Sequence, residues 1–356
     1  MIRFTRRLMV FLGIGWLLLT GLEFVSKQWP PNFTHVRNLD RIYEVLEESD
    51  RLEVLVLGNS HAEALDWTEM GVIGTDLGLP WNEAVGVEHQ VEALLPDLPG
   101  LHTALIAITP ITFRWDNDLA GGSSYLFSRR LFHSATPYSG LVNGDWHSYV
   151  RGRAYWLVRE DNWYRVILGM AGRDPYTEER DHYYNIRMDT VPEALLNEHA
   201  ENRVALKVAR QEEMTAQRPG LERDGYHALS TAIRELQEEG IRVILFTPPY
   251  YPRYVELYEE HPAWAEMQVL ARRLARKHGV AWHDFSSDTL SLDHTNFRDS
   301  DHLNDRGKVL FTRRFVDTVC SDEPPAIVDR PGSVCLSAAL NPVTAGTARN
   351  LFHWAN

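Results

Sequence analysis

Residues 53–61 read EVLVLGNSH, a short run of aliphatic side chains that ends in a glycine and a polar turn. Such runs are typical of buried parallel strands, and Gly58 marks a tight turn at the end of this one. Ser60 then lies where a strand gives way to a helix. A serine at that place can be an ordinary helix cap, or a nucleophile whose own N–H meets a developing oxyanion. The local sequence leaves both interpretations open.

Three further aliphatic runs alternate with helical patterns along the chain. The strand-like runs lie at 104–108, 243–246 and 280–283, and the amphipathic helical patterns at 39–48, 82–95, 225–239, 263–277 and 305–319. Alternation of this kind predicts an α/β fold, in which helices cover both faces of a parallel sheet. Ligands of such sheets bind outside the C-terminal ends of the strands, which is where Ser60 is expected.

A second polar block, residues 299–304 with the sequence DSDHLN, follows the last predicted strand and precedes the last predicted helix. A histidine on this loop would reach the same sheet edge as Ser60 and could act as its general base, with an aspartate to orient the ring. A serine needs such a base because its free hydroxyl is barely acidic. Alone, the block could be a solvated acidic cap. Together with the first block, it favours a triad of Ser60, His302 and Asp299.

These two blocks resemble the motifs of the SGNH, or GDSL-like, hydrolases. Residues 58–60, Gly-Asn-Ser, stand where the family has G-D-S after its first strand, and Asp299 and His302 match its D-x-x-H before the last helix. The resemblance implies a flavodoxin-like three-layer α/β/α sandwich, with Ser60 as nucleophile, His302 as base and Asp299 as its acid. Asp301 is the alternative acid, since some relatives use D-x-H. A helical turn would favour Asp299, because it brings positions three apart together.

The resemblance also implies an oxyanion hole. Its donors would be the N–H of Ser60, the N–H of a glycine after the second strand, for which Gly78 is correctly placed, and an Asn side chain after the third strand. That Asn is absent, because residues 109–112 read TPIT in place of G-x-N-D. Asn82 is the candidate replacement. Loss of one such donor costs about 10²–10³-fold in rate, which bears on efficiency more than on the type of reaction.

The N-terminus predicts a membrane segment. Residues 8–22, LMVFLGIGWLLLTGL, carry no charge and follow Arg3, Arg6 and Arg7, so the basic end is expected in the cytoplasm and the rest outside it, in the periplasm. No A-x-A cleavage site follows, which favours a single-pass anchor over a cleaved signal peptide.

The predicted domains follow from these features. They are an anchor or signal segment (1–27), a linker and leading helix (28–50), a catalytic domain (51–320) with an aromatic-rich insertion at about 113–220, and a tail (321–356). Cys320 and Cys335 are the two cysteines of the chain and could pair in an exported protein.

Charge and motif content narrow the function. The net charge of −13 argues against a nucleic-acid partner, which needs a clustered basic face. A metal-dependent hydrolase is a weaker alternative: several side chains could cluster at the strand ends, but neither H-E-x-x-H nor paired C-x-x-C spacing is present, and we expect no cofactor or metal. The side chains in question are His61, His283, Asp284, Asp299, Asp301 and His302.

An anchor joined to an SGNH-like domain without the third block resembles envelope proteins that move acyl groups onto or off surface polymers, such as exopolysaccharide O-acetyltransferases. The sequence therefore predicts an extracytoplasmic serine esterase or O-acyltransferase, acting on acyl, chiefly acetyl, esters of a cell-envelope polysaccharide. A membrane-bound protein could supply the acyl donor. Esterase and transferase share one acyl-enzyme and cannot be told apart by the triad. A catalytically weak or inactive envelope scaffold, or a polysaccharide-binding protein, is the alternative.

Overall fold

The structure is a computed structural model of the chain. It describes residues 10–11, 13–15, 17, 41–42, 45–78, 82–114, 167–168, 170–173 and 191–321. The chain divides into two compact units, Met1–Asp40 with Arg130–Asn185, and Arg41–Arg129 with Ile186–Asn356. All elements discussed below belong to the second unit.

Several predicted features fall mainly outside the described residues. The linker, the residues at 115–166 of the predicted insertion and the tail after Ser321 lie there. So does most of the predicted anchor, of which Val10, Phe11, Ile14 and Leu17 are helical and exposed. Within the described part of the chain, no helix combines the length and the apolar character needed to span a bilayer. Cys320 is disulfide-bonded, and Cys335 lies beyond the described residues.

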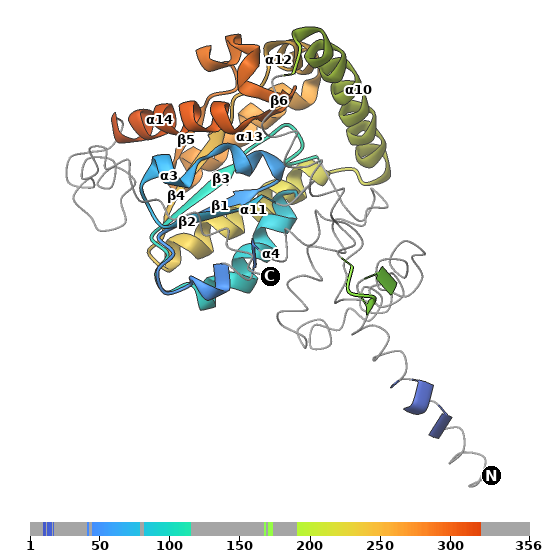
Figure 1. The fold of residues 1–356 in the computed structure, drawn as a ribbon, viewed down its shortest axis with the longest axis vertical. Helices are drawn as coiled ribbons and strands as arrows, with labels where there is room; N and C mark the ends of the chain where they lie inside the picture. Colours follow the sequence, from blue (N-terminus) through green and yellow to red (C-terminus); the bar gives the residue numbers. More distant parts are fainter. Residues whose placement is uncertain are drawn as a thin grey trace. The chain divides into compact units, whose positions relative to one another are not determined.

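Five parallel strands form the central sheet, in the order β2-β1-β3-β4-β5 (Figure 1). They are β1 (Val54–Gly58), β2 (Gly74–Gly78), β3 (Thr103–Ala107), β4 (Arg242–Thr247) and β5 (Ala281–Asp284). The α/β class and the parallel sheet are thus confirmed, and four strands lie where the aliphatic runs predict them. The sequence of β2, GTDLG, has no such run.

Helices connect the strands and cover the sheet. The α-helices are α3 (Trp67–Met70), α4 (Ala84–Leu94), α10 (Glu193–Gln217), α11 (Leu221–Glu238), α12 (Pro252–Glu259), α13 (Pro262–His278) and α14 (Asp305–Ser321). Short 3-10 helices are η1 (Ser60–Ala64), η2 (Leu95–Asp97), η3 (Thr289–Leu292) and η4 (His294–Asn296). Predicted helices correspond to α4, α11, α13 and α14, whereas α10 and α12 were not predicted as elements.

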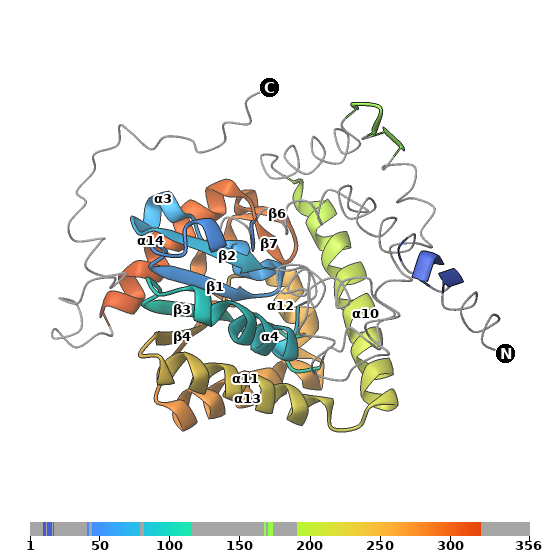
Figure 2. The same ribbon diagram turned by 90° about the horizontal axis from the view of Figure 1, so that it is seen from below.

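Alternate residues of a strand point to opposite faces of the sheet. The central strands β1, β3 and β4 are buried almost throughout, so both faces are covered there, whereas the edge strands β2 and β5 are partly exposed. Towards α3 and α14 the core contains Val54, Val56, Leu105, Ala107, Ile244, Phe246, Met70, Phe311 and Phe315. Figure 2 shows α4, α11 and α13 on the other side of the sheet, where α4 contacts β1, α11 contacts β4 and α13 contacts β5. This arrangement is compatible with a three-layer α/β/α sandwich.

A two-stranded antiparallel hairpin, β6 (Phe297–Asp299) and β7 (His302–Leu303), precedes α14. Its register pairs Asp299 with His302 across the two residues of the turn. The expectation of a helical turn at this place is therefore wrong. The two side chains nevertheless come together, because residues opposite each other in an antiparallel pair lie side by side.

Gly58 provides a test of how tightly the end of β1 is packed. Its φ is +137°, and a Cβ there would lie 3.1 Å from the Cβ of Ala107 and 3.2 Å from its carbonyl oxygen. We expect Gly58→Ala to lower the free energy of unfolding by about 2–4 kcal/mol, from strain and overpacking together.

Gly279→Ala is the matched control, since Gly279 also has positive φ (+64°) but nothing within 4 Å of its Cβ position. Gly279→Ala should lower the free energy of unfolding by about 1–2 kcal/mol. Denaturant titration of both variants measures the difference, and equal losses would contradict the packing described.

Candidate active site

The turn after β1 is held by the side chain of Asn59. Its Oδ1 accepts a hydrogen bond from the backbone N–H of His61 at 3.1 Å, which caps η1, and its Nδ2 donates to Thr109 Oγ1 at 2.7 Å. Thr109 follows β3, where the SGNH pattern would have its third block. The polar side chain after β3 thus fastens the turn that carries Ser60, the first residue of η1.

Ser60, His302 and Asp299 form a continuous chain of hydrogen bonds. The Nε2 of His302 lies 2.8 Å from Ser60 Oγ, and its Nδ1 lies 2.9 and 3.0 Å from the two carboxylate oxygens of Asp299. With Nδ1–H donated to Asp299, the lone pair of Nε2 faces the serine hydroxyl. This is the arrangement that lets a histidine take the proton of a serine nucleophile.

Asp301 lies beside the same histidine but makes different bonds. Its Oδ1 is 3.5 Å from His302 Nδ1, beyond hydrogen-bond distance, whereas its Oδ2 lies 2.6 Å from Lys207 Nζ and 3.1 Å from His61 Nε2. Of the two candidate acids, Asp299 is therefore the one hydrogen-bonded to His302.

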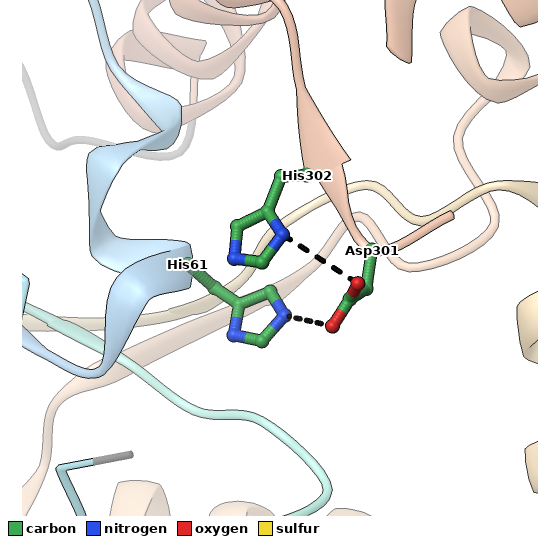
Figure 3. Close-up of side chains that lie close together, drawn as sticks. All are labelled: His61, Asp301 and His302. Atoms are coloured by element: carbon green, nitrogen blue, oxygen red, sulfur yellow. Dashed lines mark hydrogen bonds and ion pairs between the residues drawn. The ribbon is translucent and has the colours of Figure 1, made fainter. Parts of the chain in front are cut away.

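The ring of His61 stacks on that of His302, with centroids 4.5 Å apart and planes inclined by 5°. Figure 3 shows the two rings side by side, with Asp301 contacting both. Burial first, and then the neighbouring His302 and Lys207, lower the pKa of His61 to about 3. His61 is therefore uncharged at neutral pH.

Two opposing influences act on the pKa of His302. Burial by itself lowers the pKa of His302, but the charges of Asp299 and Asp301 outweigh it and leave the pKa above the ordinary value. Burial in turn raises the pKa of Asp299, yet the attraction of His302 keeps it below its usual range. Asp299 is thus an ionised carboxylate that stabilises a proton on His302.

The two other predicted oxyanion residues lie near the turn. Gly78 ends β2 opposite Gly58, and a Cβ on it would lie 2.8 Å from the carbonyl oxygen of Asn59, so only glycine allows this close approach. Asn82 is buried, and its Nδ2 donates to the carbonyl of Gly58 at 3.2 Å and to Gln90 Oε1 at 3.0 Å. Both amide hydrogens of Asn82 therefore have acceptors elsewhere, and its amide braces the end of β1.

A pocket opens beside Ser60 and His302. Its other described lining residues include Pro248, Pro249, Arg298, Leu303 and Lys308. Its volume is about 10 Å³, which is room for about one water molecule next to the serine.

The structure brings together only part of the predicted metal cluster. Ligand atoms of His61, Asp301 and His302 lie within 4.8 Å of one another, and a second group joins Asp299 and Asp301 with His199, which was not predicted. His283 and Asp284 lie on β5 and belong to neither group among the described residues. The ammonium of Lys207, 2.6 Å from Asp301, already neutralises the carboxylate that a cation would need. These residues do not fit a metal ion.

Sequence reasoning missed the contribution of α10. The buried residues of this helix are Leu196, Ala200, Val204, Lys207, Gln211 and Met214. They recur at helical spacing, so Lys207 and Gln211 continue an apolar stripe. A lysine in such a stripe signals a buried partner, because a buried ammonium without one is strongly disfavoured. The sequence alone could not show that this partner is Asp301.

Comparisons with known proteins return neither a matching family model nor a significant match among curated proteins. The arrangement of Ser60, His302 and Asp299 is therefore the basis on which function can be inferred. The same arrangement also assigns separate roles to the two aspartates, and these can be tested individually.

We expect Asp299→Asn to lower the rate at which a fluorophosphonate labels Ser60 by about 10³–10⁴-fold, because the amide no longer fixes the productive tautomer of His302. Its melting temperature should barely change. Asp301→Asn should instead lower the free energy of unfolding by about 3–5 kcal/mol, since it leaves Lys207 buried without its carboxylate.

Labelling of the folded Asp301→Asn protein should stay within about tenfold of the wild-type rate. Gel-based labelling and thermal denaturation of the two variants measure these effects. The reverse pattern, with labelling lost only in Asp301→Asn, would assign the acid to Asp301.

Proposed function

We propose that this protein is a serine esterase or O-acyltransferase of the SGNH type. The observation that carries the proposal is the hydrogen-bonded series Ser60–His302–Asp299 at the C-terminal edge of the parallel sheet. The strand order β2-β1-β3-β4-β5 is that of flavodoxin-like sheets, which supports the finer fold assignment. So does the position of Ser60 after β1 and of Asp299 and His302 before α14.

The chemistry would proceed in two steps. Ser60 Oγ attacks the carbonyl carbon of an acyl ester while its proton passes to His302 Nε2. Collapse of the tetrahedral intermediate breaks the ester bond, and His302 protonates the departing alkoxide oxygen. An acyl group then remains on Ser60. Water or a sugar hydroxyl, deprotonated by His302, attacks this acyl-enzyme and releases the acid or a new ester together with free Ser60.

Asp299 and the N-terminal turn of η1 would supply the electrostatics of these steps. Asp299 stabilises the imidazolium formed at His302, and the N–H of Ser60, at the start of η1, is the candidate donor to the oxyanion. Gly78, next to the turn, is the second candidate. Thr109 is hydrogen-bonded to Asn59, and the amide of Asn82 is hydrogen-bonded to Gly58. Neither Thr109 nor Asn82 therefore replaces the third-block asparagine as an oxyanion donor.

The small pocket beside Ser60 favours a short acyl group such as acetyl over a long one. The sugar or other alcohol would extend outwards from it. The resemblance in architecture alone suggests the substrate and the partner. They would be a cell-envelope polysaccharide, as acceptor or substrate, and a membrane-bound protein that supplies the acyl donor.

The site is further proposed to face the periplasm, with residues 8–22 as a membrane anchor. The apolar run and the arginines before it support this topology. A reporter that is active only in the cytoplasm, fused after Asn356, should therefore be silent. Activity of that reporter would overturn the topology without touching the catalytic proposal.

The alternative, an inactive scaffold, is favoured by the missing third-block asparagine, and a triad analysis separates it from the enzyme. Ser60→Ala and His302→Ala should each remove nearly all hydrolysis of an activated acetyl ester, with the melting temperature almost unchanged. The double variant should be little worse than either single one, because triad members act as a unit.

Ser291→Ala is the control, since Ser291 is a buried serine that lies in η3, outside the triad. It should keep full activity. A Ser60→Ala protein that hydrolyses the ester at the wild-type rate would refute the proposed function.

A further inference from the structure

Two carboxylates flank the proposed base. The oxygens of Asp299 lie 2.9 and 3.0 Å from His302 Nδ1, and the Oδ1 of Asp301 lies 3.5 Å from the same nitrogen. Two full negative charges beside one imidazole favour its protonated form. A protonated His302 cannot accept the proton of Ser60, so the second carboxylate would hinder the first step unless its charge were offset.

The helix α10 supplies the offsetting charge. Lys207 Nζ lies 2.6 Å from Asp301 Oδ2 and 2.9 Å from the hydroxyl of Tyr254, and Arg203 Nε lies 3.4 Å from the same carboxylate oxygen. Lys207 and Asp301 are each only 1% exposed. An ion pair this deep in the protein is screened little by solvent, so Lys207 acts strongly on the charge of Asp301.

We propose that Lys207 is a positioning residue of the active site, which offsets part of the charge of Asp301 so that Asp299 has the larger influence on the charge of His302. Asp301, together with Asn59 at the other ring nitrogen, then orients the ring of His61 against that of His302. The consequence for turnover rests on the proposed function, whereas the consequence for the proton affinity of His302 does not.

The other groups around this cluster do not replace Lys207. Burial raises the pKa of Tyr250 and Tyr254, so both tyrosines are neutral, and His61 is neutral as well. The side chain of Arg203 is 27% exposed and its contact with Asp301 is longer than that of Lys207.

Two groups on other parts of the site face Asp299 more than Asp301 or lie near both. Arg298 on β6, 3.8 Å from Glu63, also attracts the carboxylate of Asp299. His199 on α10 is hydrogen-bonded through Nδ1 to Ser300 Oγ at 2.9 Å, and a ring nitrogen of it lies within 4.8 Å of both carboxylates. Burial raises the pKa of Asp301, but its charged neighbours, Lys207 foremost among them, hold it well below its usual range.

The hairpin and α10 are separated by almost a hundred positions in the sequence, yet Asp301 in the turn of the hairpin pairs with both Lys207 and Arg203 of α10. The position of α10 is therefore coupled to the protonation of His302. Lys207 needs no contact with substrate for this role, which distinguishes it from a catalytic residue.

The test compares four forms of the full-length chain: wild type, K207R, K207M and the double variant K207M/D301N. The first readout is the pKa of His302, followed by NMR of histidines carrying ¹³C at Cε1, with the His302 signal identified by its loss in H302Q. The second readout is the pH dependence of fluorophosphonate labelling. K277M is the control, because Lys277 lies on α13 against Tyr226.

In K207M we expect the pKa of His302 to rise by about one unit, as the charge of Asp301 is no longer offset. Because the neutral ring is the active form, the acid limb of labelling should move to higher pH by the same amount. At a pH below the wild-type midpoint the rate should fall about tenfold. K207R and K277M should leave both readouts near wild type.

The double variant carries the test even where K207M fails to fold, because it leaves no unpaired buried charge. If Lys207 offsets part of the charge of Asp301, removing both should lower the pKa of His302 by clearly less than the effect of one full carboxylate. If Lys207 has only a structural role, removing Asp301 along with it should lower that pKa by the full effect of a carboxylate, and the inference fails.

Failure of the proposed function looks different. In that case Ser60 is not labelled in the wild-type protein, while the NMR shifts still follow the pattern above. Normal labelling of the wild-type protein, together with an unchanged pKa of His302 in K207M, would refute the role of Lys207. The proposed function would then still stand.

Discussion

The hydrogen bond between Ser60 Oγ and His302 Nε2 joins residues 242 positions apart, and every functional statement about this protein depends on it. It can form because parallel strands end at one edge of the sheet, and the turn after β1 and the hairpin before α14 both lie there. The packing of helices against the sheet holds the strands, and therefore that edge, in place. The bond between Asn59 and Thr109 then fixes the turn on it.

Around this contact the protein buries more charge than a triad requires. Asp299, Asp301, Lys207 and His302 meet in one region, and isolated charges there would be strongly disfavoured. The four side chains form two pairs of opposite charge, which removes this cost. Asp299 with His302 carries the proposed chemistry, and Asp301 with Lys207 forms a largely neutral support that holds His61. The stacked His61 in turn limits the rotation of the His302 ring.

Local sequence predicted the elements whose signal is local. The aliphatic runs identified four strands, and glycine with serine after one of them predicted the turn that carries Ser60. β2 was not predicted, because GTDLG lacks an apolar run and its pairing with β1 comes from tertiary packing. The juxtaposition of Asp299 and His302 was expected from a helical turn but arises from a hairpin, since both geometries bring positions three apart together.

Other parts of the site depend on long-range contacts that no window of sequence contains. The choice between Asp299 and Asp301 is made by Lys207, which lies in the predicted insertion and occupies Asp301. The amide of Asn82 is taken by Gly58 and Gln90 for the same reason, because partners from other elements decide which hydrogen bonds a buried amide makes.

The most direct measurement of the central claim is the position of the acyl group during turnover. The full-length protein is mixed with an activated acetyl ester, quenched in acid within the first turnovers, digested and mapped by mass spectrometry. The account predicts an acetyl group on the peptide that contains Ser60, absent in the His302→Ala protein, and lost to an added oligosaccharide or to water. Sustained turnover with no acetyl group on Ser60 would contradict it.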